Sequence, residues 1–328
     1  MLQCCAFFGI TSTVFSVELP LDISAAHART IFMITNPNLR LLAAVLLMFM
    51  TIASFTMMAI AGRYVSDELD TFEIMMYRSL IGFILILSFT IMTKRFHTIQ
   101  ISFLRDHFLR NVFHFSAQNL WFYAITVIPL VQVFALEFTV PIWILILSPF
   151  FLGEVFTRPR AIAAILGFIG ILIITRPDAE TLNTGTIAAG LAALGFAGSI
   201  MLTKGLTRKQ NTLSILLIMT VMQLVFGVLC AGYDFDIAGL SKTNYIWVIT
   251  IGVAGLMAHL CLTTALSLAP TTVVSPIDFL RLPVIAVVGY LLFGETVDQY
   301  LVYGVILICV GNYVNVLAER SGISRATS

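Results

Sequence analysis

Two stretches of this 328-residue sequence decide its fold, because each reads as a copy of the other. Residues 129–154 are PLVQVFALEFTVPIWILILSPFFLGE, and residues 270–295 are PTTVVSPIDFLRLPVIAVVGYLLFGE. Both stretches begin with proline, carry an acidic residue at the same position and end in Gly-Glu. Each is also apolar and long enough to cross the ~30 Å hydrocarbon core of a bilayer.

A shift of 141 residues extends this match over residues 119–170 without a gap. Ala124 then falls on Ala265, and Gly170 falls on Gly311. Prolines, glycines and acids are scarce in so apolar a chain, so their coincidence indicates an internal repeat rather than similar composition.

The composition excludes a soluble protein. Hydrophobic residues make up 59% of the chain and charged residues only 11%, whereas soluble domains average about 45–50% and about 25%. A soluble surface cannot absorb this excess, so we expect lipid to be the main solvent. A formal charge of +1 without a basic tract argues against nucleic-acid binding. The five cysteines form no metal-ligand pattern and are predicted to pack as small apolar residues.

Ten segments meet the length of about 20 apolar residues that a membrane-spanning helix needs. They are residues 40–61, 72–93, 109–128, 130–152, 160–176, 185–203, 212–232, 244–266, 271–293 and 299–318. The loops between them are short, so no soluble domain is inserted. The sequence therefore predicts an all-α integral membrane protein with ten transmembrane helices.

The basic residues predict the orientation. Thirteen lysines and arginines fall on one side of the ten segments and three on the other. Cytoplasmic loops carry the excess of Lys and Arg, so we expect both termini in the cytoplasm. Short loops and the lack of a targeting signal favour a bacterial inner membrane as the location.

Each copy of the repeat contains five helices, so the second copy must enter the membrane in the opposite direction. We expect an N-terminal cytoplasmic extension over residues 1–39, repeats over 40–176 and 185–318, and a cytoplasmic tail over 319–328. Inverted repeats of this kind are typical of secondary transporters. A second start at Met33 would make residues 1–32 dispensable or untranslated, which mass spectrometry of the native N-terminus tests.

The five-plus-five repeat and its two Pro to Gly-Glu stretches resemble the drug/metabolite transporter superfamily, EamA type, over residues 40–318. This resemblance implies a carrier of amino acids, nucleotide-like metabolites, vitamins such as riboflavin, or drugs. It also implies a central cavity between helices 1, 3 and 4 and helices 6, 8 and 9. Arg78 matches an arginine that such proteins often carry early in helix 2. The chain departs from the pattern at Arg63, near which many members have a lysine.

Charged residues inside the bilayer are costly, by about 3 to over 10 kcal/mol, and each needs an explanation. Glu137 could bind a cationic part of a substrate, carry a proton, or pair with another helix. Asp278 and Arg281 are three residues apart on one helical face and could form an ion pair, a gate or a carboxylate-binding site. Arg78 could contact substrate, extend toward the surface, or pair with Glu73.

Polar and aromatic residues extend this candidate site. Gln118 and Trp121 can share a helical face, and the repeat shift places Gln118 on His259. Interhelical hydrogen bonding is the alternative role for each, worth about 1 kcal/mol or less per contact in membranes.

We therefore interpret the chain as a secondary active transporter that moves a small organic metabolite by alternating access. The predicted substrate-binding residues are Glu137, Arg281, Asp278, Gln118, His259, Trp121 and Arg78. No catalytic residue, metal or cofactor is predicted, and protons are a candidate coupling ion. A passive channel is the alternative, followed by a membrane-embedded enzyme, for which the sequence lacks a catalytic motif. Substrate identity, direction and oligomeric state stay open, a homodimer included.

Overall fold

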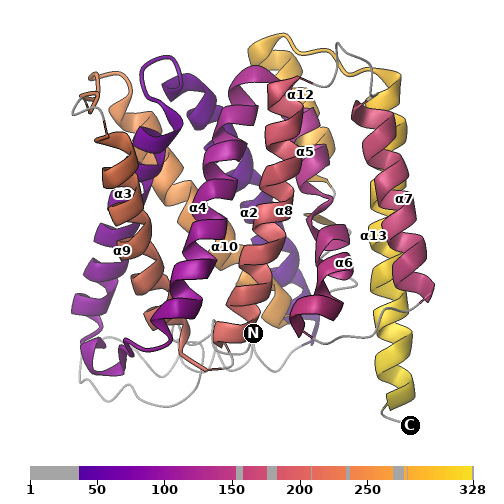
Figure 1. Ribbon diagram of the computed structural model, residues 1–328, viewed down its shortest axis with the longest axis horizontal. Coiled ribbons are helices and arrows are strands. Elements are labelled where there is room, and N and C mark those ends of the chain that lie inside the picture. Colours follow the sequence, from indigo (N-terminus) through magenta and orange to yellow (C-terminus); the bar gives the residue numbers. More distant parts are fainter. Residues whose placement is uncertain are drawn as a thin grey trace.

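The protein is a bundle of helices (Figure 1). The computed structural model describes residues 37–152, 158–175, 183–207, 209–233, 237–268, 277–278 and 280–326. The helices are α2 (Pro37–Val65), α3 (Thr71–Met92), the short 3₁₀ helix η2 (Phe96–Thr98), α4 (Leu104–Val127), α5 (Leu130–Glu137), α6 (Val140–Leu152), α7 (Arg158–Thr175), α8 (Thr184–Thr207), α9 (Thr212–Ala231), α10 (Tyr245–Leu268), α12 (Arg281–Phe293) and α13 (Gln299–Ala326).

Each of the ten expected apolar segments overlaps a described helix. Within the described ranges, five helices are long and apolar enough to cross a membrane: Asn38–Val65, Thr71–Met92, Thr184–Thr207, Thr212–Ala231 and Tyr245–Leu262. The remaining apolar helices are shorter, and α4 is more polar than its neighbours. The expected all-α membrane architecture is therefore confirmed at this level.

One expected helix is broken. The segment predicted as 130–152 consists of α5 and α6, which are separated at Phe138 and Thr139. Pro141 explains the restart, because proline lacks a backbone N–H and is tolerated only in the first turn of a helix. The break lies in the interior of the bundle, where Phe138 and Thr139 are buried.

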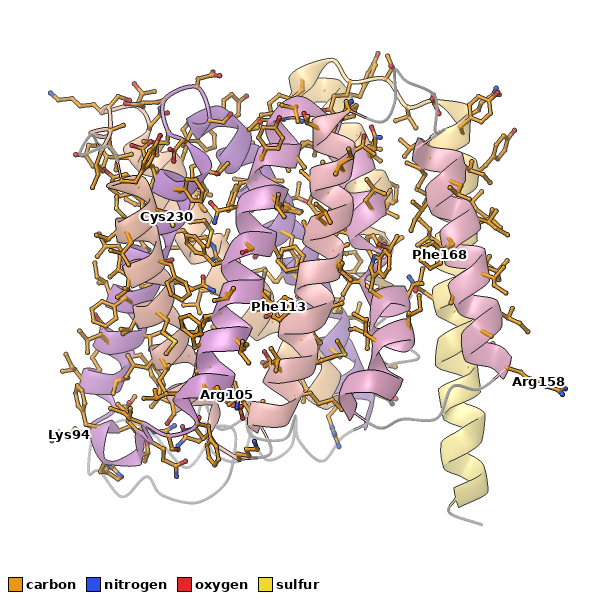
Figure 2. All side chains as sticks on the ribbon, viewed as in Figure 1. Lys94, Arg105, Phe113, Arg158, Phe168 and Cys230 are labelled. Carbon is orange, nitrogen blue, oxygen red and sulfur yellow. The ribbon has the colours of Figure 1, made fainter. Side chains whose placement is uncertain are left out.

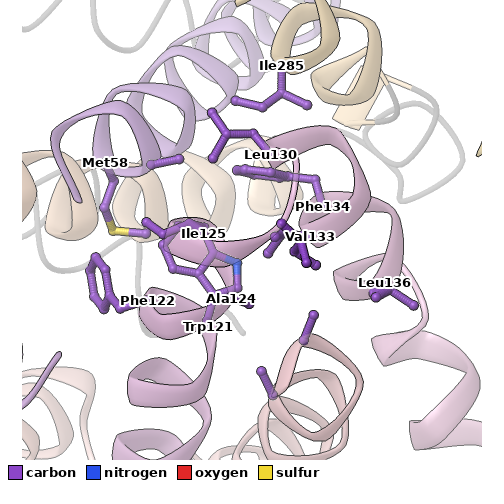
Figure 3. Packing of buried hydrophobic residues seen from close by; sticks show 14 of the residues in the cluster. Met58, Trp121, Phe122, Ala124, Ile125, Leu130, Val133, Phe134, Leu136 and Ile285 are labelled. Atoms are coloured by element: carbon purple, nitrogen blue, oxygen red, sulfur yellow. The ribbon is translucent and has the colours of Figure 1, made fainter. Parts of the chain in front are cut away.

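The helices pack in pairs that join the first part of the chain to the second. The most extensive contacts are between α2 and α10, α4 and α8, α7 and α13, and α3 and α9. The buried core centres on α4 and α5, where Trp121 packs edge-on against Phe122 and Phe134 (Figure 3). Lys94, Arg105 and Arg158 lie near one end of the bundle (Figure 2), as their predicted placement on one side requires.

The contact between α7 and α13 is unusually close. A methyl carbon added at Gly170 would lie 2.7 Å from the carbonyl oxygen of Gly304, and one added at Gly304 would lie 2.6 Å from that of Gly170. No side chain fits at either position without moving the helices apart. The two helices lie side by side at one edge of the bundle (Figure 1).

Candidate functional site

The helix break places two opposite charges inside the bundle. Glu137 is the last residue of α5, and Arg281 is the first residue of α12. A carboxylate at a helix C-terminus and a cation at a helix N-terminus are both disfavoured by the helix dipole. Each residue therefore gains from the presence of the other. Asn312 of α13 supports the break by donating a hydrogen bond from Nδ2 to the carbonyl oxygen of Phe138, at 2.9 Å.

Arg281 is shared by two acids, and we call Arg281, Glu137 and Asp278 the Arg281 group. Its Nη1 lies 3.2 Å from Oε1 of Glu137, and its Nη2 lies 3.4 Å from Oδ2 of Asp278. The Nε1 of Trp121 donates to Oε2 of Glu137 at 2.9 Å. The spacing of Asp278 and Arg281 predicted their pair, but Glu137 as the second acid was not foreseen.

Aromatic rings surround the guanidinium group of Arg281. Its central carbon lies 4.7 Å from the centre of the Phe55 ring, 5.2 Å from that of Phe134 and 4.8 Å from that of Phe138. Cation–π contacts of this length stabilise a desolvated cation. Two polar atoms of the group, Nε of Arg281 and Oδ1 of Asp278, are buried without a hydrogen-bond partner in the described part of the chain. The Arg281 group thus has bonding capacity left for a ligand.

A second group of polar residues lies in the same interior. His259 packs edge-on against Phe55, with ring centres 5.5 Å apart, so one ring separates it from Arg281. Although His259 lies among the interior arginines Arg78, Arg110 and Arg281, its side chain is exposed. The ring of His259 is therefore surrounded by cationic side chains of neighbouring helices without being covered by them.

Arg78 does not pair with Glu73, so that alternative was wrong. Glu73 instead completes the capping box of α3 with Asp70 and accepts a hydrogen bond from the backbone N–H of Ala238, at 2.6 Å. Arg78 extends inward to α10, where a methyl carbon added at Gly255 would lie 3.2 Å from its Nε.

The structure brings some of the seven predicted site residues into direct contact and places the others farther away. Glu137, Asp278, Arg281 and Trp121 are in direct contact. His259 joins them through Phe55, and Arg78 lies within electrostatic range of His259. Gln118 is buried one turn of α4 from Trp121, with its Oε1 unpartnered in the described structure.

Sequence reasoning missed Arg110 as an interior residue and counted it among the thirteen basic residues on the cytoplasmic side, because it would be only the second residue of a helix that begins at 109. The helix begins at Leu104 and carries Arg110 into the bundle, where it is 8% exposed. Polar residues that recur at helical spacing could have revealed that this face of α4 lies in the interior. All of them are buried: His107, Arg110, Asn111, His114 and Gln118.

A second ion pair joins the end of α2 to the turn between α12 and α13. Arg63, near the end of α2, pairs with Glu295 in the turn between α12 and α13. Arg63 also donates to the carbonyl oxygens of Ile125 and Ile128 and lies 4.8 Å from the centre of the Phe293 ring. We call Arg63 and Glu295 the Arg63 group.

Apolar helices that enclose ion pairs, while large hydrophobic side chains cover the outside, define a multi-pass membrane protein with a polar interior. The chain belongs to the EamA-like transporter family, whose model matches residues 42–176 and again residues 183–317. The two matched regions begin 141 residues apart, the same shift that aligns the two copies of the sequence repeat. Family membership identifies the chain as a transporter.

Relatives with named substrates include two kinds of transporter. The S-adenosylmethionine uptake transporter of Rickettsia bellii (strain RML369-C) is 25% identical over 266 residues, which cover 81% of this chain and 90% of that protein. The riboflavin transporter of Brucella anthropi is 30% identical over 223 residues, covering 67% of this chain and 78% of that protein. A crystal structure that is 16% identical superposes with a TM-score of 0.57 over 85% of this chain and 98% of its own, which shows a shared fold.

Proposed function

We propose that this chain is a secondary carrier that moves a small organic metabolite across a bacterial inner membrane. Its two inverted repeats, residues 40–176 and 185–318, would expose one central site to each side in turn. The observation that carries the proposal is the ion pair between Glu137 and Arg281 in the interior, at 3.2 Å. Charges are placed inside a membrane at considerable cost, and a binding site is the usual reason.

The positions of the helix ends support this choice of site. Under the 141-residue shift, Val140, which restarts the helix in the first repeat, falls on Arg281, which begins α12 in the second. Helices that begin at corresponding places in two repeats fit the discontinuous helices from which carriers build substrate sites. Glu137, Arg281 and Asp278 would then contact the substrate, with Trp121, Gln118, His259 and Arg78 around it.

The charges of the Arg281 group favour an organic cation as substrate. Two acids face one arginine, and aromatic rings lie beside them. S-adenosylmethionine, which the Rickettsia relative is named for, combines a positive centre with a flat base and suits this site. Riboflavin would use the rings but not the charges, and we rank it second.

The Arg63 group supports alternating access. It joins a residue of the first repeat to one of the second at one end of the bundle, and so would hold that end closed. The orientation predicted from Lys and Arg makes this the outer end, with the site open toward the cytoplasm. Opening it would require this ion pair to separate.

The test is a thermal-shift screen of the detergent-purified protein against S-adenosylmethionine, riboflavin, amino acids, nucleosides and cationic drugs. A ligand that binds only the folded state raises the melting temperature. We expect S-adenosylmethionine to raise it, and Glu137→Gln to abolish the rise. Asp106→Asn, which removes an exposed acid that pairs with Lys209, is the control.

Transport is then measured in proteoliposomes with the ligand that binds. Saturable uptake that Glu137→Gln abolishes supports the carrier, and its pH profile tests proton coupling. Binding that survives both Glu137→Gln and Arg281→Gln would place the site elsewhere. Flux that does not saturate would favour the channel instead.

A further inference from the structure

The interior contains a second cationic centre that the Arg281 group does not neutralise. Arg110 and His114 of α4, Arg78 of α3 and His259 of α10 repel one another electrostatically. Neither Arg78 nor Arg110 forms an ion pair in the described ranges. Glu137 and Asp278 are both engaged by Arg281.

Among the residues that the structure describes, Arg110 donates hydrogen bonds to neutral groups only. Its Nε donates to Oγ1 of Thr203 at 3.1 Å, and its Nη1 donates to Oδ1 of Asn111 at 2.9 Å. These contacts fix the direction of the guanidinium group without cancelling its charge. The charge therefore remains available to an anion.

Arg78 has still fewer contacts. Its Nε is buried without a hydrogen-bond partner among the described residues, and its guanidinium group packs against Gly255 and near Met58. On α4, Gln118 is 3% exposed and its Oε1 also lacks a partner in the described part of the chain. Buried polar groups are nearly always hydrogen-bonded, so unpartnered ones in the interior are open to a ligand that completes them.

We propose that Arg78 and Arg110 bind the carboxylate of a substrate whose positive centre lies beside Glu137 and Asp278. The inference rests on the proposed carrier function and specifies its substrate class: organic cations that also carry a carboxylate. Phe55 links the two centres, because its ring contacts both Arg281 and His259.

The charges explain why one substrate would use both places. Two arginines without an acid attract an anion, and two acids that share one arginine attract a cation. Arginine binds carboxylates with paired, charge-assisted hydrogen bonds. A compound with one charge only would leave one of the two centres unmatched, which disfavours its binding.

Two ligands that differ only in the carboxylate provide the test. S-adenosylmethionine and decarboxylated S-adenosylmethionine are titrated by calorimetry into the detergent-purified full chain. We expect the carboxylate to tighten binding about tenfold or more, the factor that corresponds to about 1.4 kcal/mol. In Arg110→Gln, S-adenosylmethionine should bind as weakly as the decarboxylated compound, whose own affinity stays unchanged.

Two control variants separate binding from structure. Lys209→Gln removes a positive charge at the bundle surface, where Lys209 pairs with Asp106, and should leave both affinities as in the wild type. Arg110→Lys keeps the charge and should recover part of the preference for the carboxylate. Equal binding of the two ligands by the wild type, or an equal loss of both in Arg110→Gln, would overturn the proposal. Binding of riboflavin but not S-adenosylmethionine would be consistent with the proposed carrier function but would overturn the proposed carboxylate site.

If no ligand binds, the melting temperature of the ligand-free protein still tests the arginine site. An unpaired cation with no hydrogen-bond partner destabilises the empty protein, so Arg78→Met should raise its melting temperature. A lower melting temperature would mean that Arg78 has a stabilising role, which contradicts an empty anion site. Failure of every ligand to bind would count against the proposed function, whereas this result tests the arginine site separately.

Discussion

The Arg281 group and the Arg63 group are built from the same kinds of residue but differ in whether their polar atoms all have hydrogen-bond partners. Each joins an arginine to an acid from the other part of the chain, and each arginine lies against phenylalanine. In the Arg63 group all three kinds of guanidinium nitrogen donate: one to Glu295 and two to backbone carbonyl oxygens. Glu295 in turn accepts from the backbone N–H of Leu130, at 2.9 Å.

The Arg281 group is incomplete by comparison. The Nε of Arg281 and Oδ1 of Asp278 have no hydrogen-bond partner in the described residues, and its ion-pair distances are 3.2 and 3.4 Å. A saturated group holds the fold, whereas an unsaturated one can exchange partners with a ligand. The difference predicts that changes at the Arg63 group affect stability first and changes at the Arg281 group affect binding first.

The largest effect is expected from Glu295→Gln. The side chain of Arg63 is 16% exposed and that of Glu295 9%, so this change leaves a mostly buried charge without its partner. Breaking such a pair destabilises by about 3 kcal/mol, and a denaturation curve of the purified protein measures the loss. The double variant Arg63→Gln/Glu295→Gln should lose less than the sum of the single changes. A loss below about 1 kcal/mol would match an exposed surface pair instead.

A smaller effect, on binding rather than stability, is expected from Asp278→Asn. Arg281 retains Glu137 in this variant, and Asp278 is 22% exposed in its side chain. We expect affinity for a cationic substrate to fall about tenfold, or about 1.4 kcal/mol, in a calorimetric titration. The melting temperature should fall less than in Glu295→Gln. A larger fall in melting temperature in Asp278→Asn than in Glu295→Gln would contradict the distinction between the two groups.

Asn312→Ala tests the support behind the Arg281 group. It removes the hydrogen bond to the carbonyl oxygen of Phe138 at the helix break, and a bond of this kind contributes about 1 kcal/mol. Both the melting temperature and substrate affinity should decrease slightly, because Glu137 precedes the break. If neither changes, Thr139, whose Oγ1 donates to the carbonyl oxygen of Leu136, is enough to hold the break.

The smallest effect is expected in an exposed loop. Glu68 accepts hydrogen bonds from Asn244 and Ser241, and these bonds lower its pKa below the ordinary value of 4.5. The stabilisation is therefore present above about pH 4.5 and lost as the pH falls through the lowered pKa. Wild type should melt slightly above Glu68→Gln at pH 7, and the gap should close in acid. A gap that stays constant with pH would exclude the carboxylate as its cause.

The sequence predicted the helices well because a membrane-spanning helix depends mainly on its own composition. Charge pairs between residues three positions apart were equally predictable from the sequence, as the spacing of Asp278 and Arg281 showed. Contacts between helices were not, because the distance from Glu137 to Arg281 depends on how α5 and α12 pack. Arg63 and Glu295 were read only as loop residues, since their pairing joins positions far apart in the chain. Arg110 was missed through an error of five residues in a helix start, from 109 to Leu104.

The close crossing of α7 and α13 has a consequence for the history of the sequence. Gly170 belongs to the first region that matches the family and Gly304 to the second, and each backbone occupies the space where the other would need a side chain. A substitution at one position cannot be absorbed by a smaller residue at the other, since glycine is already the smallest. The two halves of the chain differ in their charges, but this crossing requires glycine in both.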